Sequence, residues 1–513
     1  MSMAPQLHAY GVDRKTRTAR CIAVARRISK TKRTKRDEIP TMRLLLDVVG
    51  RHGAEHSAAS GTGRWRTTSL LGVCGAVALA AALPLAMASG SPGGGASPKS
   101  TRRQAGARPG WGFTHTQYSA EHGTPEATRK AGALLSARPL PQNQHIMGWG
   151  AENPEPAPGR YDFQALDERV ALMRATGATP VLTLCGAPDW MKGGRRGRTD
   201  WSRLEAAPDR RHYKDFARLA GAIARRYPDI RHFLVWNELK GFYDEDKRRW
   251  NYEGYTQLYN LVYAELKKQN PDNLVGGPYV VADHDAPADD PEDRSPELRG
   301  PWGELDQRSA DVIHYWNAHK AGADFVVVDG SSYTREGHET IPDEFAATEK
   351  FAALTRWLRN ITGLPVWWAE WYVEPPAEDD RPGGRDGWNE HHRTAVHATA
   401  MMHLAASGAS AAFYWNPQRT GDDCPGCLWR STHLPDGGQG LPMARLLNRF
   451  AHEFPPGSAF RPVDATAEPG AKIQVLADDA AVLVVNTERR PVAARVDGKA
   501  LSLAPYEVRW LAR

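Results

Sequence analysis

The sequence predicts an α/β protein, a (β/α)8 TIM barrel followed by a small C-terminal β-sandwich domain. Eight short apolar runs alternate with longer amphipathic segments between residues 111 and 457, and this alternation favours a closed parallel barrel over an open sheet. Glu238 follows one of the runs closely, and Glu370 ends another. No Gly-x-Gly-x-x-Gly or phosphate loop follows any of the runs, which argues against a nucleotide-binding fold.

The first 110 residues differ from the rest in composition. Residues 1–66 hold 15 Lys and Arg against 5 Asp and Glu without a sustained period, which predicts a basic, disordered leader. The whole chain is +6, so the remainder is about −4 and does not have the charge of a nucleic-acid-binding protein.

Residues 67–88 combine a positive flank, an apolar run over 70–88 and the small-residue motif Ala86-Met87-Ala88. This pattern predicts a secretory signal peptide, with an uncleaved membrane anchor as the alternative. Residues 89–110, rich in Gly, Pro and Ser, are expected to form a flexible linker. We therefore expect a secreted protein, or an extracellular one anchored in the membrane.

The barrel strands are predicted from apolar runs bounded by turn residues. They are Gly112–Thr116, His145–Trp149, Thr179–Leu184, His232–Trp236, Leu274–Tyr279, Asp324–Asp329, Val366–Glu370 and Ala411–Asn416. Between them, apolar residues recur at helical spacing. The predicted helices are Asp167–Thr176, Tyr213–Tyr227, Tyr255–Gln269, Ser309–Ala321, Glu344–Asn360 and His391–Ala406. Two long loops, Asp283–Gly303 and Glu374–Trp388, are expected to close one end of a cleft.

From residue 458 onwards the segments are shorter. Strand-like runs cover residues 471–476, 481–485 and 492–496, with turn signals at Asp478-Asp479 and Asp497-Gly498. Residues 458–513 are therefore predicted to form a β-sandwich that packs on the barrel and stabilises it. Sugar binding by this domain is the less favoured alternative.

The two strand-terminal glutamates are the candidate catalytic residues. Glu238 follows Trp236 and Asn237 directly after an apolar strand, and Glu370 lies among aromatic residues. The carboxyl ends of parallel strands meet at one rim of a barrel, which is where barrel enzymes act. Two carboxyl groups in different surroundings can serve as acid and nucleophile. The alternative for either residue alone is a salt-bridged surface glutamate.

The strand ends Asn237-Glu238 and Glu370 resemble those of the clan of retaining glycoside hydrolases with (β/α)8 barrels. Two further motifs, Pro154–Phe163 and Pro180–Trp190, are most similar to glycoside hydrolase family 39, which includes β-xylosidases and α-L-iduronidases. The resemblance covers roughly residues 111–510. It implies that Glu238 is the acid/base and Glu370 the nucleophile, with an oligosaccharide or polysaccharide substrate and no metal or other cofactor.

Two strand ends depart from the family pattern. Leu239-Lys240-Gly241 follows Glu238 where the family usually has Pro-Asn, and the sixth strand ends in Asp329 where the family often has His. The chemistry is therefore better determined than the sugar. We expect β-xylosidase-like, exo-acting cleavage. The alternatives are an endo-acting glycanase, a carbohydrate-binding barrel without activity and a membrane-anchored structural protein.

Several other residues are predicted to lie at the rim and bind substrate, with core packing as the alternative for each aromatic residue. Asn237 is expected to hydrogen-bond a sugar hydroxyl, and Tyr333 the nucleophile. The remaining candidates are His115, Trp149, Trp190 and Trp415. Cys424 and Cys427 form a C-x-x-C motif, for which a local disulfide is favoured over a redox pair or half a zinc site.

Overall fold

The computed structural model describes residues 109–286, 293–375, 387–415 and 424–512. The predicted leader, the signal or anchor segment, nearly all of the linker and Asn416 lie outside the described residues. The described residues all belong to one compact unit. Within the described residues, no helix is both long enough and apolar enough to span a membrane.

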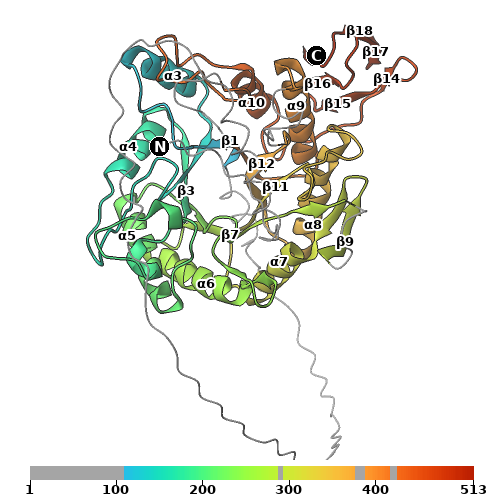
Figure 1. The fold of residues 1–513 in the computed structure, drawn as a ribbon. Coiled ribbons are helices and arrows are strands. Elements are labelled where there is room, and N and C mark those ends of the chain that lie inside the picture. Colours follow the sequence, from blue (N-terminus) through green and yellow to red (C-terminus); the bar gives the residue numbers. More distant parts are fainter. Residues whose placement is uncertain (1–108, 287–292, 376–386, 416–423, 513) are drawn as a thin grey trace, which may run out of the picture. The chain divides into compact units, whose positions relative to one another are not determined.

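Eight parallel strands close into a barrel in the order β1-β13-β12-β11-β7-β4-β3-β2, which confirms the predicted fold class (Figure 1). The strands are β1 Gly110–Thr114, β2 Pro141–His145, β3 Thr179–Leu184, β4 His232–Val235, β7 Leu274–Val281, β11 Phe325–Ser331, β12 Val366–Tyr372 and β13 Ala411–Trp415. Glu238 therefore follows the fourth barrel strand, and Glu370 lies near the end of the seventh, which continues to Tyr372 rather than ending at Glu370.

The second strand was predicted at the wrong place. It covers Pro141–His145 rather than His145–Trp149, and its sequence is polar. The buried amide of Asn143 donates to Thr114 Oγ1 (3.1 Å) and accepts from Thr183 Oγ1 (2.9 Å). Because neighbouring strands satisfy these polar groups, the strand needs no apolar pattern.

The helices surround the strands in chain order (Figure 1). Within the described residues the α-helices are α3 Pro125–Ala137, α4 Gln164–Ala175, α5 Tyr213–Arg226, α6 Tyr252–Gln269, α7 Gln307–His319, α8 Glu349–Thr362, α9 Glu390–Ala406 and α10 Pro442–Glu453. The six predicted helices are confirmed, with ends that differ by a few residues, and α3 and α10 were not predicted. Their apolar faces pack against the outer side of the strands in one large core.

A second, separate core fills the inside of the barrel. It includes Leu234, Phe325, Val327 and Trp367, whereas their strand neighbours Val326 and Trp368 belong to the outer core. This alternation is the period of two expected of a strand between two apolar layers. It determines which strand-end side chains point into the barrel mouth.

Short strands follow β4 and β7 on the way to the next helices. They are the pair β5 Tyr243–Asp244 and β6 Arg249–Trp250, and a three-stranded sheet of β8 His284–Asp285, β10 Gly303–Asp306 and β9 Arg294–Gly300. The predicted loop Asp283–Gly303 thus contains strands, with residues 287–292 outside the described part. Most of the other predicted loop, Glu374–Trp388, also lies outside it.

The C-terminal residues form two three-stranded antiparallel sheets, β14-β17-β18 and β15-β16-β19, around a small core of their own. The strands are β14 Ala465–Ala467, β15 Ile473–Ala477, β16 Ala481–Asn486, β17 Val492–Val496, β18 Lys499–Leu503 and β19 Val508–Ala512. The predicted sandwich is confirmed, and the Asp497-Gly498 turn has the positive φ angles (45° and 78°) of a tight hairpin. Tyr506 stacks on His392 of α9 at 4.1 Å, which joins the sandwich to the barrel.

Candidate active site

Three buried carboxyl groups meet at the carboxyl ends of the strands. Glu238 follows β4, Asp329 lies on β11 and Glu370 on β12, and each offers an oxygen within 4.8 Å of the others. Their exposed fractions are 7%, 2% and 2%. The structure therefore brings the two predicted glutamates together and adds an aspartate.

Glu370 points into the barrel because β12 carries a bulge. Trp367 and Ala369 face the inner core, so simple alternation would turn Glu370 outward. The register between β11 and β12 shifts after Val328, so that Asp329 pairs with Glu370 and Ala369 is the extra residue. Such a bulge reverses the alternation beyond it, and both carboxyls then face the mouth.

A second bulge brings in Tyr279. The register between β11 and β7 shifts so that Val327 pairs with Pro278 and Val328 with Val280, which leaves Tyr279 between them. Its φ is 56°, an angle that is uncommon outside glycine. Its hydroxyl donates to Glu370 Oε1 at 2.6 Å, so this bulge provides a hydrogen bond to the predicted nucleophile.

The segment after β4 folds back on itself. Trp236, Glu238 and Leu239 have φ angles of 72°, 49° and 48°. The Lys240 amide donates to Asn237 O (3.0 Å), and the Trp236 indole donates to Lys240 O (2.8 Å). This turn places the Lys240 ammonium 2.8 Å from Glu238 Oε2.

The residues that depart from the family pattern have structural roles here. Lys240 also pairs with Glu205 at 2.8 Å, and Leu239 is fully buried. Gly241 has a φ of 78°, and a Cβ there would lie 2.2 Å from the backbone nitrogen of Ala207. Only glycine allows this close approach, which holds the loop carrying Glu205 against Lys240.

The surroundings of Glu370 act on its charge in opposite directions. Burial, followed by the negative charge of Glu238, raises the pKa of Glu370 to about 7, whereas the hydroxyls of Tyr279 and Tyr372 lower it. Tyr372 also donates to Glu370, on Oε2. The two tyrosines favour the ionised form that a nucleophile needs.

The surroundings also shift the pKa values of Asp329 and Lys240, and in both cases they favour the protonated form. Burial raises the pKa of Asp329 well above its ordinary value, and the charges of Glu238 and Glu370 and a hydrogen bond with Glu238 add to this. Burial alone would lower the pKa of Lys240, but Glu238 and Glu205 outweigh burial and raise it. The site therefore contains a fixed positive charge beside three carboxyls.

Aromatic side chains and an amide form one wall of the site. The His145 ring lies 4.3 Å from the Trp149 ring and 6.3 Å from that of Trp415. Burial lowers the pKa of His145 to about 4, and its Nε2–H donates to Asn237 Oδ1 at 3.3 Å. The same nitrogen lies 3.9 Å from Glu370 Oε1. The structure thus brings together Asn237, Trp149 and Trp415 of the predicted substrate-binding residues.

Three other predicted residues make contacts elsewhere. His115 is buried between Ser119 (2.6 Å) and Gln142 (2.9 Å). The Trp190 indole donates to the Glu155 carbonyl at 2.8 Å. These two environments correspond to the packing alternative. Tyr333 packs edge-on against His338, while the hydroxyls bound to Glu370 come from Tyr279 and Tyr372.

Cys424 and Cys427 are joined in a disulfide, in agreement with the favoured interpretation of the C-x-x-C motif. The carbonyl of Gly426, between them, accepts a hydrogen bond from the buried hydroxyl of Tyr414 on β13. This hydrogen bond therefore ties the disulfide-bonded turn to the last barrel strand.

Among the described residues, Glu238, Asp329 and Glu370 form a cluster of carboxyls close enough together to share one cation. Lys240 already pairs with Glu238, and two tyrosine hydroxyls donate to Glu370. These donors engage Glu238 Oε2 and both oxygens of Glu370, whereas the buried Asp329 Oδ2 has no hydrogen-bond partner. The arrangement is suited to holding and moving protons.

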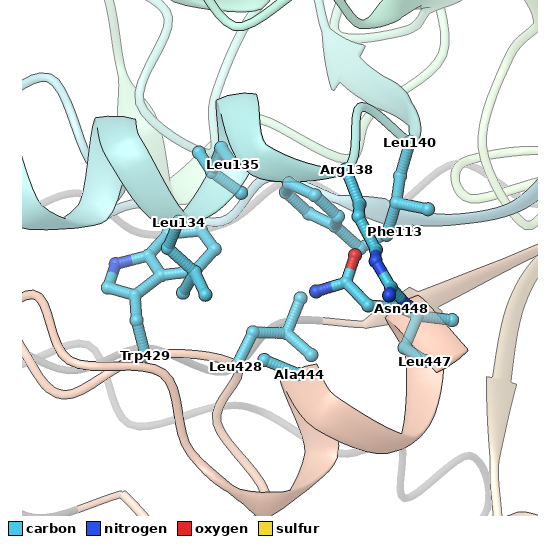
Figure 2. A pocket seen from close by; sticks show the side chains of 10 residues that line it. All are labelled: Phe113, Leu134, Leu135, Arg138, Leu140, Leu428, Trp429, Ala444, Leu447 and Asn448. Atoms are coloured by element: carbon cyan, nitrogen blue, oxygen red, sulfur yellow. The ribbon is translucent and has the colours of Figure 1, made fainter. Parts of the chain in front are cut away.

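A separate apolar pocket lies away from these residues, between α3, β1 and α10 (Figure 2). Its ten lining residues include Phe113, Leu135, Trp429 and Leu447. None of the predicted site residues lines it, and the side chains in Figure 2 are mostly apolar. The pocket thus belongs to the packing between the barrel and its outer helices.

Sequence reasoning missed His145, Lys240, Tyr279 and Tyr372 as members of this site, and treated Asp329 only as a departure from a pattern. Tyr372 stands two residues after Glu370, which was a usable signal. The sequence gives no comparable signal for Tyr279 and Lys240. Their positions depend on a bulge and on a left-handed turn that strand periodicity does not reveal.

No family model and no curated protein matches this sequence. Similar solved structures include a glucosidase from Croceicoccus marinus (14% identity, 74% of this chain, 75% of that chain, TM-score 0.43). A second is a GH30 endoxylanase from Clostridium papyrosolvens C71 (16% identity, 75% of this chain, 83% of that chain, TM-score 0.44). A third is a GH39 beta-xylosidase from Caulobacter crescentus (15% identity, 75% of this chain, 76% of that chain, TM-score 0.42). At these identities and TM-scores, the similarities carry no argument about what this chain does.

Proposed function

We propose that this protein is a retaining glycoside hydrolase in which Glu370 is the nucleophile and Glu238 the acid/base. The observation that carries the proposal is the pair of buried glutamates at the ends of β4 and β12, whose oxygens lie within 4.8 Å. Retaining glycosidases hold their two carboxyls about 5 Å apart, and inverting enzymes need roughly 6.5–9.5 Å to admit a water molecule. The short distance supports double displacement.

In the first step, Glu370 attacks the anomeric carbon while Glu238 gives a proton to the departing oxygen. In the second step, Glu238 takes a proton from water as that water displaces Glu370. The hydroxyls of Tyr279 and Tyr372 support the roles of the two glutamates, because they favour the anion at Glu370 that must attack.

The proposed substrate is an oligosaccharide or polysaccharide. Half-buried Trp149 and Trp415 lie at right angles to one another, with ring centres 6.5 Å apart. Such rings can pack on the apolar face of a sugar, while Asn237 offers its amide to a hydroxyl. We propose exo-acting, β-xylosidase-like cleavage from the sequence resemblance, and export from the apolar run at residues 70–88.

The assignment is tested by replacing each glutamate with alanine and adding azide to reactions with activated aryl glycosides. Glu370→Ala should lose turnover and recover it with azide, giving a glycosyl azide of inverted configuration. Glu238→Ala should give an azide of retained configuration, because azide then intercepts the covalent intermediate. Glu297→Ala, at an exposed position on β9, is the control and should behave as the unmodified protein.

An unchanged rate in Glu370→Ala would refute the nucleophile assignment. A carbohydrate-binding barrel without activity is the alternative function. In that case no glycoside would be cleaved by the unmodified protein, and Trp415→Ala would still weaken the binding of oligosaccharides in calorimetry.

A further inference from the structure

Asp329 has no role in the two steps above, although it lies inside the catalytic cluster. It is 2% exposed, pairs with Glu370 across β11 and β12 and shares a hydrogen bond with Glu238. The titratable groups facing it come from β7, β12, α8 and the segment after β4. They are Glu238, Lys240, Tyr279, Glu370, Tyr372 and Lys350 of α8.

A hydrogen bond between two carboxyl groups requires one proton, because two carboxylates offer only acceptors. Three ionised carboxyls at this spacing would also repel one another strongly in a buried site. Lys240 can balance only one negative charge. The hydrogen bond therefore requires that the Glu238–Asp329 pair carries one proton and one negative charge. In the form that reacts, Glu370 is ionised and carries a second negative charge.

We propose that Asp329 and Glu238 share one proton, and that Asp329 is a positioning residue that keeps Glu238 able to act as the acid. This inference rests on the proposed function. Lys240 alone, 2.8 Å from Glu238, would favour the ionised form of Glu238, which cannot protonate a leaving group. The hydrogen bond with Asp329 offsets this effect.

The shared proton also keeps the charge of the cluster constant during the reaction. When the Glu370 oxygen bonds to the anomeric carbon, the bond to the leaving oxygen breaks, and that oxygen receives the proton from Glu238. Glu370 becomes a neutral ester while Glu238 and Asp329 are both ionised, so two negative charges remain. In the second step, water bonds to the anomeric carbon, Glu238 takes its proton and Glu370 leaves as a carboxylate.

The first test uses the stability of the folded protein and needs no activity. Burial raises the pKa of Asp329, so the folded protein holds a proton that the unfolded chain releases above about pH 4. Stability from this proton is present at low pH and is lost as the pH rises. For each pH unit, the equilibrium constant for unfolding should therefore rise by an additional factor of about ten in the unmodified protein compared with Asp329→Asn.

Urea unfolding between about pH 5 and 7 would measure this slope. Glu238→Gln should also reduce the slope, because it removes the negative charge beside Asp329, offers it an amide donor and leaves Lys240 to favour its ionised form. The double variant should reduce the slope no further than Asp329→Asn, because the pair shares one proton. Asp324→Asn is the matched control, since Asp324 precedes β11 at its other end and pairs with Lys267; it should keep the full slope. Equal slopes in Asp329→Asn and the unmodified protein would overturn the proposal.

The second test uses aryl glycosides with different leaving groups. Asp329→Asn should lower kcat/KM about 100-fold for a leaving group that needs protonation and only slightly for dinitrophenolate, which does not. An equal loss for both would indicate a merely structural role and overturn the proposal. If the unmodified protein cleaves no glycoside, the proposed function fails, and the unfolding slopes still decide whether the proton is shared.

Discussion

The hydroxyl of Tyr279 is expected to determine the pH at which Glu370 becomes a nucleophile. Tyr279 is fully buried, and its hydroxyl donates to Glu370 Oε1 at 2.6 Å. A hydrogen bond to a charged group contributes about 1.5–3 kcal/mol, and one pKa unit corresponds to about 1.4 kcal/mol. Tyr279→Phe should therefore raise the pKa of Glu370 by about one to two units, because it removes a donor that favours the anion.

The pH dependence of kcat/KM measures this shift, since its acidic limb reports the ionisation of the nucleophile in the free enzyme. In the unmodified protein, burial raises the pKa of Glu370 toward 7, so activity should increase with pH up to near neutrality. In Tyr279→Phe the limb should lie about one to two units higher. Below the limb, kcat/KM should fall about 10- to 100-fold at a given pH.

Tyr255→Phe provides the matched control. The Tyr255 side chain is also fully buried, but its hydroxyl donates to the Val235 carbonyl at 2.9 Å and not to a carboxylate. Its removal should cost about 1 kcal/mol of stability without moving the acidic limb. If Tyr279→Phe leaves the limb where the unmodified protein has it, the reasoning about Glu370 is wrong.

Three further substitutions test other parts of the structure. Gly241→Ala should destabilise the protein by more than about 1 kcal/mol in urea unfolding, because its φ of 78° disfavours a side chain and its Cβ would meet the Ala207 backbone; an unchanged midpoint would contradict this. Trp415→Ala should raise KM several-fold with a smaller effect on kcat, and an effect on kcat alone would place the ring elsewhere. Replacing Cys424 and Cys427 with serine should cost about 2 kcal/mol, the value for such a short loop, and equal melting temperatures would show that the bond adds no stability.

The fold was largely predictable because most of the barrel strands are apolar runs bounded by turn residues. β3 and β4 were located almost to the residue, since each has a short, mainly apolar sequence between turn signals. β2 was displaced because its inward side chains are polar and satisfied by neighbours. α3 was not predicted although Thr124 caps it and Pro125 begins it, a signal that was present in the sequence.

The candidate site was predictable only as far as strand ends determine it. Glu238 and Glu370 follow from the rule that parallel strands end at one rim. Tyr279 and Asp329 depend on register shifts between neighbouring strands, and a shift by one residue exchanges the two faces of a strand. Lys240 depends on a turn whose φ angles at Glu238 and Leu239 are unusual for their residue types. The spacing of apolar residues in the sequence carries no information about register shifts or about this turn.

The unusual backbone angles of the mouth lie on the elements that hold the carboxyls and the aromatic wall. Trp149, Glu238 and Tyr279 have φ angles of 48°, 49° and 56°, each at a cost of order 1 kcal/mol. Such conformations persist where the surrounding packing determines them, and here the buried Trp236 indole and the inner core do so. The strain at Glu238 is what turns Lys240 back onto its carboxylate. The departure from the family pattern after Glu238 thus changes the charge around the proposed acid/base, and it does so through the backbone.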